Sequence, residues 1–509
     1  MSQDISANNR RIAKNTIALY FRMFFTMIVS LYTSRVILQA LGVTDYGIYN
    51  VVGGVVSIVG LLNASISWAT ARFLTFDLGK GDREQLVRTF SMCLNIFIVL
   101  SFLFLFLAET VGLWFLNTHM TIPIERMEAA NWIYQFSVIS CVLGLLITPC
   151  NSLIFAHEDF SFSAFISILE SILKLIVAIV IMYSHFDRLI LYAFLIFVIA
   201  VIVEILNLLR CKLKYKEATY IKYWNKKQFV QILSYSGWNI FGSLSNMARG
   251  SGLNVILNMF FTPAVNAACG IANQVNGVVY GFFQSFMTAV NPQVTKYYAQ
   301  NDIGYMMELV FRSSKLCSYL VILMSIPLAI EAPTIISLWL GQVPDHVVNF
   351  VRLIVVITAI DATAFPINAT STATGDIRLY QMTMGLITIL NLPLSYIALT
   401  LGGVPEIVFV ISLILAVTSF FGRLWAVNKV IDFNIKRYLV EVCMKVVVVA
   451  CCSIVLPLIM HMYWNEGILS ALCNCVISVI STIVVIYYIG LKKTERKSII
   501  GIIIKRNND

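Results

Sequence analysis

Fourteen apolar runs, each long enough to cross a lipid bilayer as a helix, fill almost the whole of this chain of 509 residues. A spanning helix needs roughly 20 apolar residues. The polar breaks between the runs are short, and none is longer than about 20 residues, so we expect no domain outside the membrane. The pattern predicts an all-α integral membrane protein with 14 transmembrane helices near residues 15–40, 46–74, 88–115, 131–155, 162–183, 189–209, 231–258, 267–294, 311–340, 350–373, 379–400, 405–427, 438–461 and 467–490.

Charged residues are scarce, which supports the same class. They make up 12% of the chain, whereas soluble proteins have about 25%. So few charges cannot cover a soluble surface, and 59% apolar residues exclude a disordered chain. The 11 cysteines lie mostly in apolar runs, and the 5 histidines lie in or beside loops without metal-ligand spacing. We therefore expect no enzyme activity, no cofactor and no metal site.

The basic residues of the loops are divided unequally between the two sides of the predicted membrane. The two tails and the loops near 80–88, 210–227, 296, 378 and 429–437 carry 24 Lys and Arg, and the opposite loops carry only Arg126 and Arg188. Basic loops stay in the cytoplasm, so this pattern predicts cytoplasmic termini and an even number of spans. The positive charge is spread over many segments rather than one face, which argues against a nucleic-acid partner.

The chain also contains an internal repeat. Residues 47–56 read GIYNVVGGVV and residues 270–279 read GIANQVNGVV, with seven of ten positions identical, and Gly81 matches Gly304 at the same offset. The tripeptide PCN at 149–151 matches PIN at 366–368 at an offset of 217, and Asp159 matches Asp376. The repeating unit contains six spans, so both copies have the same orientation.

This repeat predicts two parallel six-helix lobes around a central cavity, with two further helices after them. We assign 1–228 to an N-lobe with a basic cytoplasmic linker, 229–430 to a C-lobe, and 431–509 to the last two spans and a cytoplasmic tail. Rocking of such lobes gives alternating access. The repeated prolines Pro149 and Pro366 interrupt helix hydrogen bonds within spans, so they are candidates for a hinge or for cavity lining, with simple helix packing as the alternative.

Four arginines inside the predicted membrane lack an acidic partner at helical spacing: Arg22, Arg35, Arg72 and Arg249. A charge near the middle of a span costs roughly 2.5–3.5 kcal/mol and usually faces a wet cavity. Guanidinium groups bind phosphate in a bidentate fork. These arginines are therefore candidates for a cationic cavity that binds a polyanion, unless each pairs with a distant acid or carbonyl group.

Further charges within the predicted spans can pair locally or reach a helix end. Glu170 and Lys174 are four residues apart and can pair on one helix face, and so can Glu441 and Lys445. Glu204 and Arg423 can extend toward a cytoplasmic helix end. Asp361, near the middle of its span, is a candidate for coupling to a proton or cation, or for the partner of an arginine.

Three segments of the chain resemble the polysaccharide-biosynthesis flippases of the multidrug/oligosaccharidyl-lipid/polysaccharide exporter superfamily. They are the N-terminal run NTIALYFRMFFTMIVSLYTSRVILQALGVTDYGIYNVVGGVVSIVGLLN, IFAHEDFSFSAFISILESILKL at 154–175, and ATGDIRLYQ at 373–381. The similarity extends over almost the whole chain, and its loose motifs specify the family better than the substrate.

The resemblance implies a flippase of the bacterial inner membrane. Such proteins translocate undecaprenyl-pyrophosphate-linked oligosaccharides, the repeat units of O-antigen, lipopolysaccharide, capsule or exopolysaccharide, to the periplasmic leaflet. It further implies membrane lipids as partners, coupling to H+ or Na+, contact with the polysaccharide polymerase machinery, and a pyrophosphate site at Arg22, Arg35, Arg72 and Arg249. The alternative is a cation-coupled multidrug antiporter of the same superfamily. A lipid II flippase is less favoured, and so is a membrane polymerase or ligase. The polymerase and the ligase need a large periplasmic loop, which we do not expect here.

Overall fold

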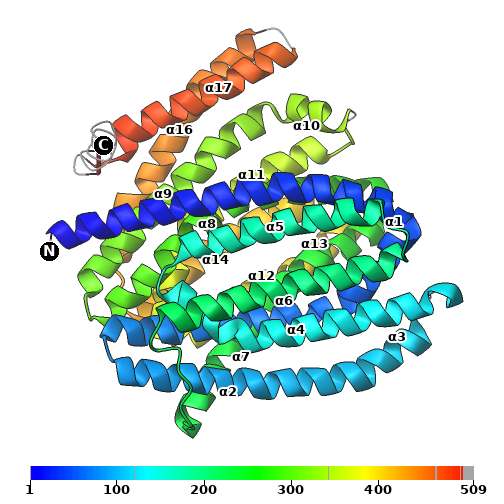
Figure 1. Cartoon of the computed structure of the whole chain (residues 1–509). Helices are drawn as coiled ribbons and strands as arrows, with labels where there is room; N and C mark the ends of the chain where they lie inside the picture. Colours follow the sequence, from blue (N-terminus) through cyan, green and yellow to red (C-terminus); the bar gives the residue numbers. More distant parts are fainter. Residues whose placement is uncertain (1, 121, 342, 465–466, 493–494, 497–509) are drawn as a thin grey trace, which may run out of the picture. The chain divides into compact units, whose positions relative to one another are not determined.

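The computed structural model describes all residues except 1, 121, 342, 465–466, 493–494 and 497–509. Within the described residues the secondary structure is entirely helical, and long helices follow one another through short loops (Figure 1). This architecture confirms the all-α membrane fold predicted from the apolar runs.

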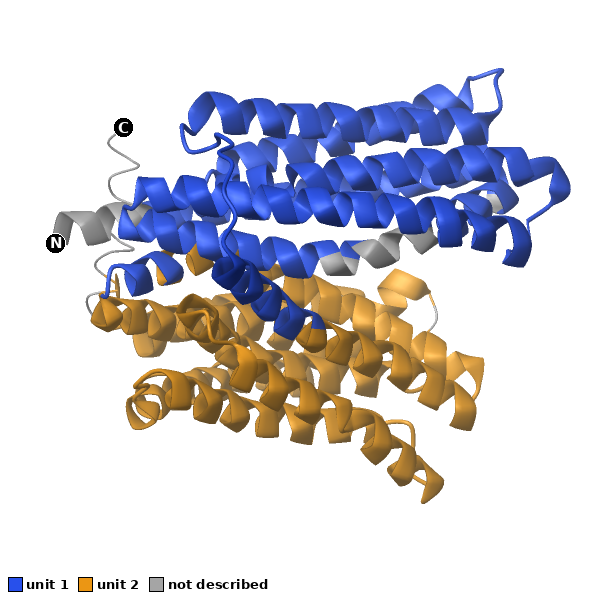
Figure 2. Ribbon diagram, turned by 90° about the horizontal axis from the view of Figure 1, so that it is seen from below, with its two compact units in different colours: residues 1–240, 295–301 blue, residues 241–294, 302–509 orange. Residues whose placement is uncertain are grey.

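The chain divides into two compact units (Figure 2). Unit 1 contains residues 1–240 and 295–301, and unit 2 contains residues 241–294 and 302–509. Helices α7 (Lys226–Phe260) and α8 (Pro263–Ala299) contribute to both units. The first boundary therefore falls inside α7, whereas the sequence places it at residue 228; the three predicted domains stay a prediction.

Unit 1 begins with α1 (Ser2–Lys80), which holds two spans joined at a kink. Gly42 supplies the kink with a φ of 78°, a left-handed conformation that glycine adopts without steric cost. The other elements are α2 (Arg83–Leu107), the π-turn Ala108–Gly112, α3 (Leu113–His119), the 3-10 turn Ile124–Arg126, α4 (Met127–Ala156), α5 (Phe160–Met182) and α6 (Arg188–Lys214).

Unit 2 continues from α7 and α8 with a longer series of helices. They are α9 (Ile303–Ile330), α10 (Ala332–Leu340), α11 (Val347–Thr374), α12 (Arg378–Ile389), α13 (Asn391–Thr400), α14 (Ile407–Val430), α15 (Ile435–Tyr438), the π-turn Leu439–Cys443, α16 (Met444–Tyr463), α17 (Ile468–Val485) and the π-turn Ile486–Gly490. The last spans, α16 and α17, pack on each other and on α9.

The same helix pairs pack in both units, as a parallel repeat requires. In unit 1, α4 contacts α2 and α6, and α5 contacts α6. In unit 2, α11 contacts α9 and α14, and α14 contacts α12 and α13. Each unit is thus built around one central helix, α4 or α11, and Pro149 and Pro366 lie in these two central helices.

The loops refine the register of the repeat. Asp82 caps α2 by accepting a hydrogen bond from the Gln85 N–H, and Asp302 caps α9 in the same way from Tyr305. The residue before each cap has positive φ, 75° at Gly81 and 63° at Asn301. The structure therefore pairs Gly81 with Asn301, not with Gly304 as the constant offset predicts.

Among the residues searched, eleven helices are long and apolar enough to cross a membrane. The second half of α1, α7 and α8 bring the number of long helical segments to the predicted fourteen, and α7 and α8 are rich in polar residues. These three segments are the second, seventh and eighth predicted spans. Polar residues in these spans need protein or water as neighbours rather than lipid.

Candidate functional site

Arg22 and Arg35 lie in the first half of α1. The Arg22 side chain is half-buried, the Arg35 side chain is exposed, and neither makes a hydrogen bond or ion pair with any residue that the structure describes. Thirteen residues of helix separate them by about 20 Å along the axis. Arg22 and Arg35 therefore lie at different depths of the first span, and their assignment to one pyrophosphate site stays a prediction.

Arg72 lies in the second half of α1 and is buried, with 9% exposure. Its guanidinium carbon is 4.8 Å from the ring centroid of Phe73 and 4.7 Å from that of Phe76. Tyr235 of α7 packs edge-on against Phe73, and Tyr298 of α8 lies beside Phe76. Such cation–π packing gives Arg72 a place in the core of unit 1, and its assignment to substrate stays a prediction.

Arg249 lies on the part of α7 that belongs to unit 2. It is half-buried and has no hydrogen-bond or ion-pair partner among the described side chains. At 100° per residue, one face of this helix beside Arg249 carries exposed polar and small residues: Ser243, Asn246, Gly250, Ser251, Asn254 and Asn258. A polar face exposed along a span needs water or a polar ligand next to it. Arg249 therefore stands at the edge of a face of α7 that carries several exposed polar residues.

The Asp361 carboxylate on α11 forms an ion pair with an arginine side chain. Arg423 of α14 donates a hydrogen bond to the Asp361 carboxylate at 2.9 Å and to its backbone carbonyl at 3.5 Å. Arg423 therefore does not extend toward a helix end, as the sequence suggests, but closes an ion pair between two helices. The arginine partner that we considered for Asp361 is thus present, and a coupling role stays a prediction.

The two repeated prolines lie inside continuous helices and are buried. Pro149 removes the N–H that would bind the Leu145 carbonyl, and Pro366 does the same in α11. The hinge assignment of these two prolines stays a prediction.

Glu204 is also placed differently from the sequence expectation. It lies ten residues before the Lys214 end of α6, about 15 Å along the helix. Its carboxylate lies near the side-chain amides of Asn151 on α4 and Asn207 on α6, and its Oε2 is buried without a hydrogen-bond partner among the described residues. The side chain thus turns toward α4 rather than extending to the helix end.

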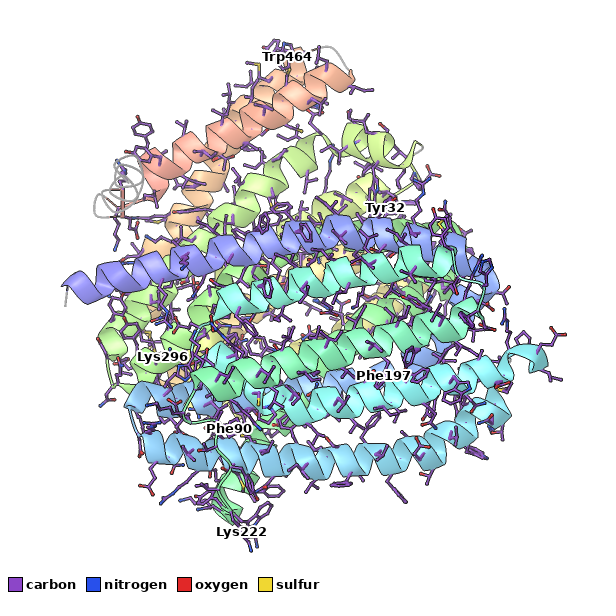
Figure 3. All side chains as sticks on the ribbon, in the orientation of Figure 1. Tyr32, Phe90, Phe197, Lys222, Lys296 and Trp464 are labelled. Atoms are coloured by element: carbon purple, nitrogen blue, oxygen red, sulfur yellow. The ribbon has the colours of Figure 1, made fainter. Side chains whose placement is uncertain are left out.

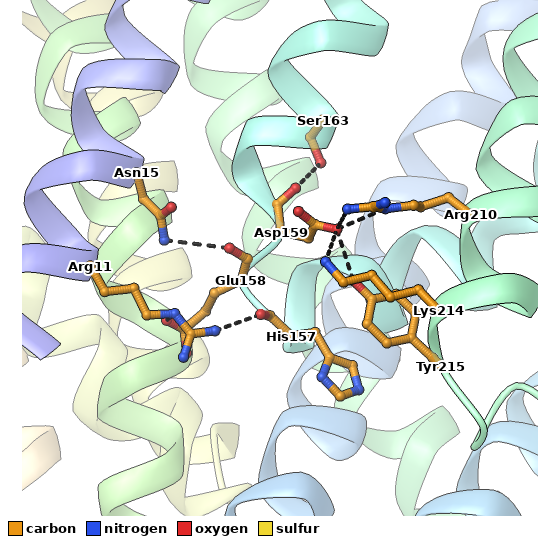
Figure 4. A network of polar contacts seen from close by, with 9 residues as sticks. All are labelled: Arg11, Asn15, His157, Glu158, Asp159, Ser163, Arg210, Lys214 and Tyr215. Atoms are coloured by element: carbon orange, nitrogen blue, oxygen red, sulfur yellow. Dashed lines mark hydrogen bonds and ion pairs between the residues drawn. The ribbon is translucent and has the colours of Figure 1, made fainter. Parts of the chain in front are cut away.

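A second charged cluster surrounds the loop between α4 and α5 (Figure 4). Glu158, fully buried, binds Arg11 of α1 at 3.1 Å and Lys296 at the end of α8. Asp159 accepts hydrogen bonds from Arg210 and Lys214, both at 2.7 Å, and from the Tyr215 hydroxyl at 3.0 Å. The cluster ties α1, the α4–α5 loop, the end of α6 and the end of α8 together within unit 1.

The titratable groups of this loop respond to these neighbours. Burial alone would raise the pKa of Asp159. The hydrogen bonds from Lys214, Arg210 and Tyr215 outweigh burial and hold this pKa below its ordinary value. Burial lowers the pKa of His157, which stacks on Tyr215 with ring centroids 4.2 Å apart, and Glu217 opposes that shift in part. From the sequence, Asp159 was identified only as a match to Asp376 in the repeat. The run of titratable residues HED at 157–159 was the signal that could have indicated a charged cluster here.

The linker between α6 and α7 lies against α2. The Ser91 hydroxyl accepts from the Ile221 N–H at 3.0 Å, and Asn95 donates to the Tyr223 carbonyl at 3.0 Å. Lys222 projects outward from this linker (Figure 3). The longest loop of the chain is therefore held to unit 1 by backbone hydrogen bonds.

Comparisons with known proteins bear on this architecture. Residues 239–397 match the MatE family model. The search of curated proteins gave no match.

Solved structures share the fold. A multidrug resistance MATE family transporter of the MOP superfamily, in an outward-facing conformation, aligns with a TM-score of 0.71 at 13% identity over 83% of this chain and 96% of its own. MATE in the straight conformation aligns at 0.69 and 14% over 83% and 97%. A MOP superfamily transporter from Pyrococcus furiosus, described as having a binding pocket of reverse polarity that suggests a different function, aligns at 0.64 and 14% over 82% and 96%.

At these identities the structures show a common fold, and the MatE segment covers less than half of the chain. Together they support the superfamily to which the sequence resemblance points. The chain therefore has the fold of the MATE transporters and carries a MatE segment within it.

Proposed function

We propose that this chain is a membrane transporter that works by alternating access and moves an amphipathic anionic substrate across the bilayer. An undecaprenyl-pyrophosphate-linked oligosaccharide, carried from the cytoplasmic to the periplasmic leaflet of a bacterial inner membrane, has the required chemistry. The observation that carries this proposal is that Arg22 and Arg249 have no acidic partner among the described residues.

Unpaired charges in a span are costly, which is why these two arginines matter. Each arginine costs roughly 2.5–3.5 kcal/mol to place in a span, and a structural role would offset that cost with a nearby acid, as Arg423 does with Asp361. Arg22 and Arg249 lack such an acid among the described residues, and Arg249 borders an exposed polar face. A phosphate-containing ligand would supply the missing negative charge through bidentate hydrogen bonds.

A cation-coupled multidrug antiporter is the second candidate. The MatE segment and the multidrug transporter among the structural neighbours favour it. The neighbour described as having reversed pocket polarity indicates that one fold serves substrates of different charge. The charge of the binding residues in this chain is therefore the property that separates the two candidates.

The test compares the two substrates directly. Arg22→Ala and Arg249→Ala are expressed in a strain that lacks its own flippase, with Arg83→Ala, an exposed residue at the start of α2, as the control. Loss of a charge-assisted hydrogen bond costs about 1.5–3 kcal/mol, so surface polysaccharide should fall about tenfold or more. Normal polysaccharide in both variants, or loss of efflux of a cationic dye without loss of polysaccharide, would favour the antiporter.

A further inference from the structure

Glu204 is a half-buried carboxylate of unit 1 without a cation among the described residues. The side-chain amides of Asn151 and Asn207 lie close enough to interact with it. Its Oε1 lies 3.7 Å from the position that a Cβ on Gly144 would occupy, and Oε2 is buried without a partner. The carboxylate therefore lies in contact range of α4 at Gly144.

The neighbouring helices do not supply a free positive charge to Glu204. On α5, Glu170 lies near enough to act on it electrostatically, but Lys174 is bound to Glu170 at 2.6 Å. On α4, the titratable neighbour is the Cys150 thiol. On α1, the side chains that pack toward α6 here are apolar, among them Val36 and Ile37. No ion pair of Glu204 exists among the residues described.

The adjacent turn of α4 offers a hydrogen-bond acceptor instead. Pro149 has no N–H, so the Leu145 carbonyl lacks its helical donor. Leu145 follows Gly144, the residue against which Glu204 lies. An ionised carboxylate has no hydrogen to donate, whereas a protonated one has an O–H that can bind such a carbonyl.

We propose that Glu204 is a proton-binding site of the transporter, formed by α6 against the proline-containing turn of α4. In the conformation described here the carboxyl holds a proton and is neutral, because its Oε2 is buried without a partner and a negative charge at that position without a cation is costly. It takes this proton from water and returns it to water when a conformational change rehydrates the site, so no other reactant is needed. The inference rests on the proposed transport function and assigns one residue to its coupling.

The test measures protonation without substrate. Full-length protein in lipid bilayers is titrated by difference infrared spectroscopy, which detects the carbonyl band of a protonated carboxylic acid. We expect a band that is lost in Glu204→Gln and kept in Glu170→Gln, a matched control on the neighbouring helix. Asn151→Ala should keep the band but shift its frequency, because one amide beside the carboxyl is removed; this second variant retains Glu204 if the glutamine variant is poorly folded.

Each outcome decides the proposal. A band that is unchanged in a folded Glu204→Gln protein, or the absence of any acid band in the wild type, overturns it. Binding of radioactive sodium that requires Glu204 without an acid band would overturn the proton and assign sodium to the site. Because no substrate is present, an error in the substrate leaves the band intact, and an ionised Glu204 leaves the transport proposal standing.

Discussion

Replacing Glu158 separates two opposing contributions to the stability of the protein. One is the strain of its left-handed backbone, and the other is the stabilisation from its ion pairs. Glu158 has a φ of 59° in the loop between α4 and α5, where the repeat places Gly375 with a φ of 84° in unit 2. A left-handed conformation costs a residue with a side chain roughly 1–2 kcal/mol. Glu158 must therefore gain more than this from Arg11 and Lys296.

The magnitudes follow from burial. Removing one partner of a buried ion pair costs about 3–5 kcal/mol, and the Lys296 side chain is 16% exposed. Arg11 is 46% exposed and contributes little. We expect Glu158→Ala to destabilise the protein by about 3 kcal/mol. Glu158→Gly should cost about 1–2 kcal/mol less, because glycine relieves the backbone.

Thermal unfolding of the detergent-solubilised protein, followed by tryptophan fluorescence, measures both changes. Gly375→Ala is the matched control, since it adds strain of about 1 kcal/mol at the corresponding position and removes no ion pair. Equal midpoints for alanine and glycine at position 158 would refute the strain. A neutral Glu158→Ala would refute the stabilising ion pair.

Three further predictions concern other charged groups. Asp361→Asn should lower the free energy of unfolding by about 3 kcal/mol because it leaves Arg423 buried without its acid. The double variant Asp361→Asn/Arg423→Gln should recover part of that loss in the same melting assay. If transport by the double variant still responds to an ion gradient, Asp361 is excluded from coupling. The lowered pKa of Asp159 adds stability that is present above roughly pH 4 and is lost as the pH falls through the pKa of Asp159 in the folded protein. Asp159→Asn should flatten this part of the pH–stability curve. An unchanged curve would contradict the stabilising role of the Asp159 carboxylate. Single cysteines in place of Arg126 and Lys226 should react with an impermeant reagent from opposite sides of the membrane, and reaction from one side would refute the proposed topology.

Local patterns in the sequence predicted much of the fold. The apolar runs predict long helices throughout, and the structure confirms them because burial in lipid depends mainly on the composition of each segment. The pair Glu170 and Lys174 is confirmed at 2.6 Å, since residues four apart share a helix face. The pair Glu441 and Lys445 was wrong, because Glu441 binds Arg437 and Lys492 instead. The register at Gly81 was wrong because the positive-φ position of the second copy is Asn301, three residues before Gly304, which already lies within α9.

Contacts between distant segments could not be predicted in this way. Arg423 and Asp361 are 62 residues apart, and Glu158 and Lys296 are 138 apart. Helical spacing carries no information on such partners, which depend on how helices pack. Glu204 was misplaced for the same reason, because Gly144 and Asn151, which receive its carboxylate, belong to another helix.

Residues 295–301 pack in unit 1, and this constrains when unit 1 can finish folding during synthesis of the chain. When α6 leaves the ribosome, α1, α4 and α5 are already present, but Lys296 follows Glu158 by 138 residues. During that interval the buried carboxylate has Arg11 as its ion-pair partner, and the first unit stays incomplete until most of α8 has been synthesised. A gene divided at the linker would thus yield a first fragment that lacks part of unit 1 and a second fragment that contains all of unit 2 together with residues 226–240 and 295–301 of unit 1. Completion of unit 1 would then depend on delivery of the end of α8 by the second fragment.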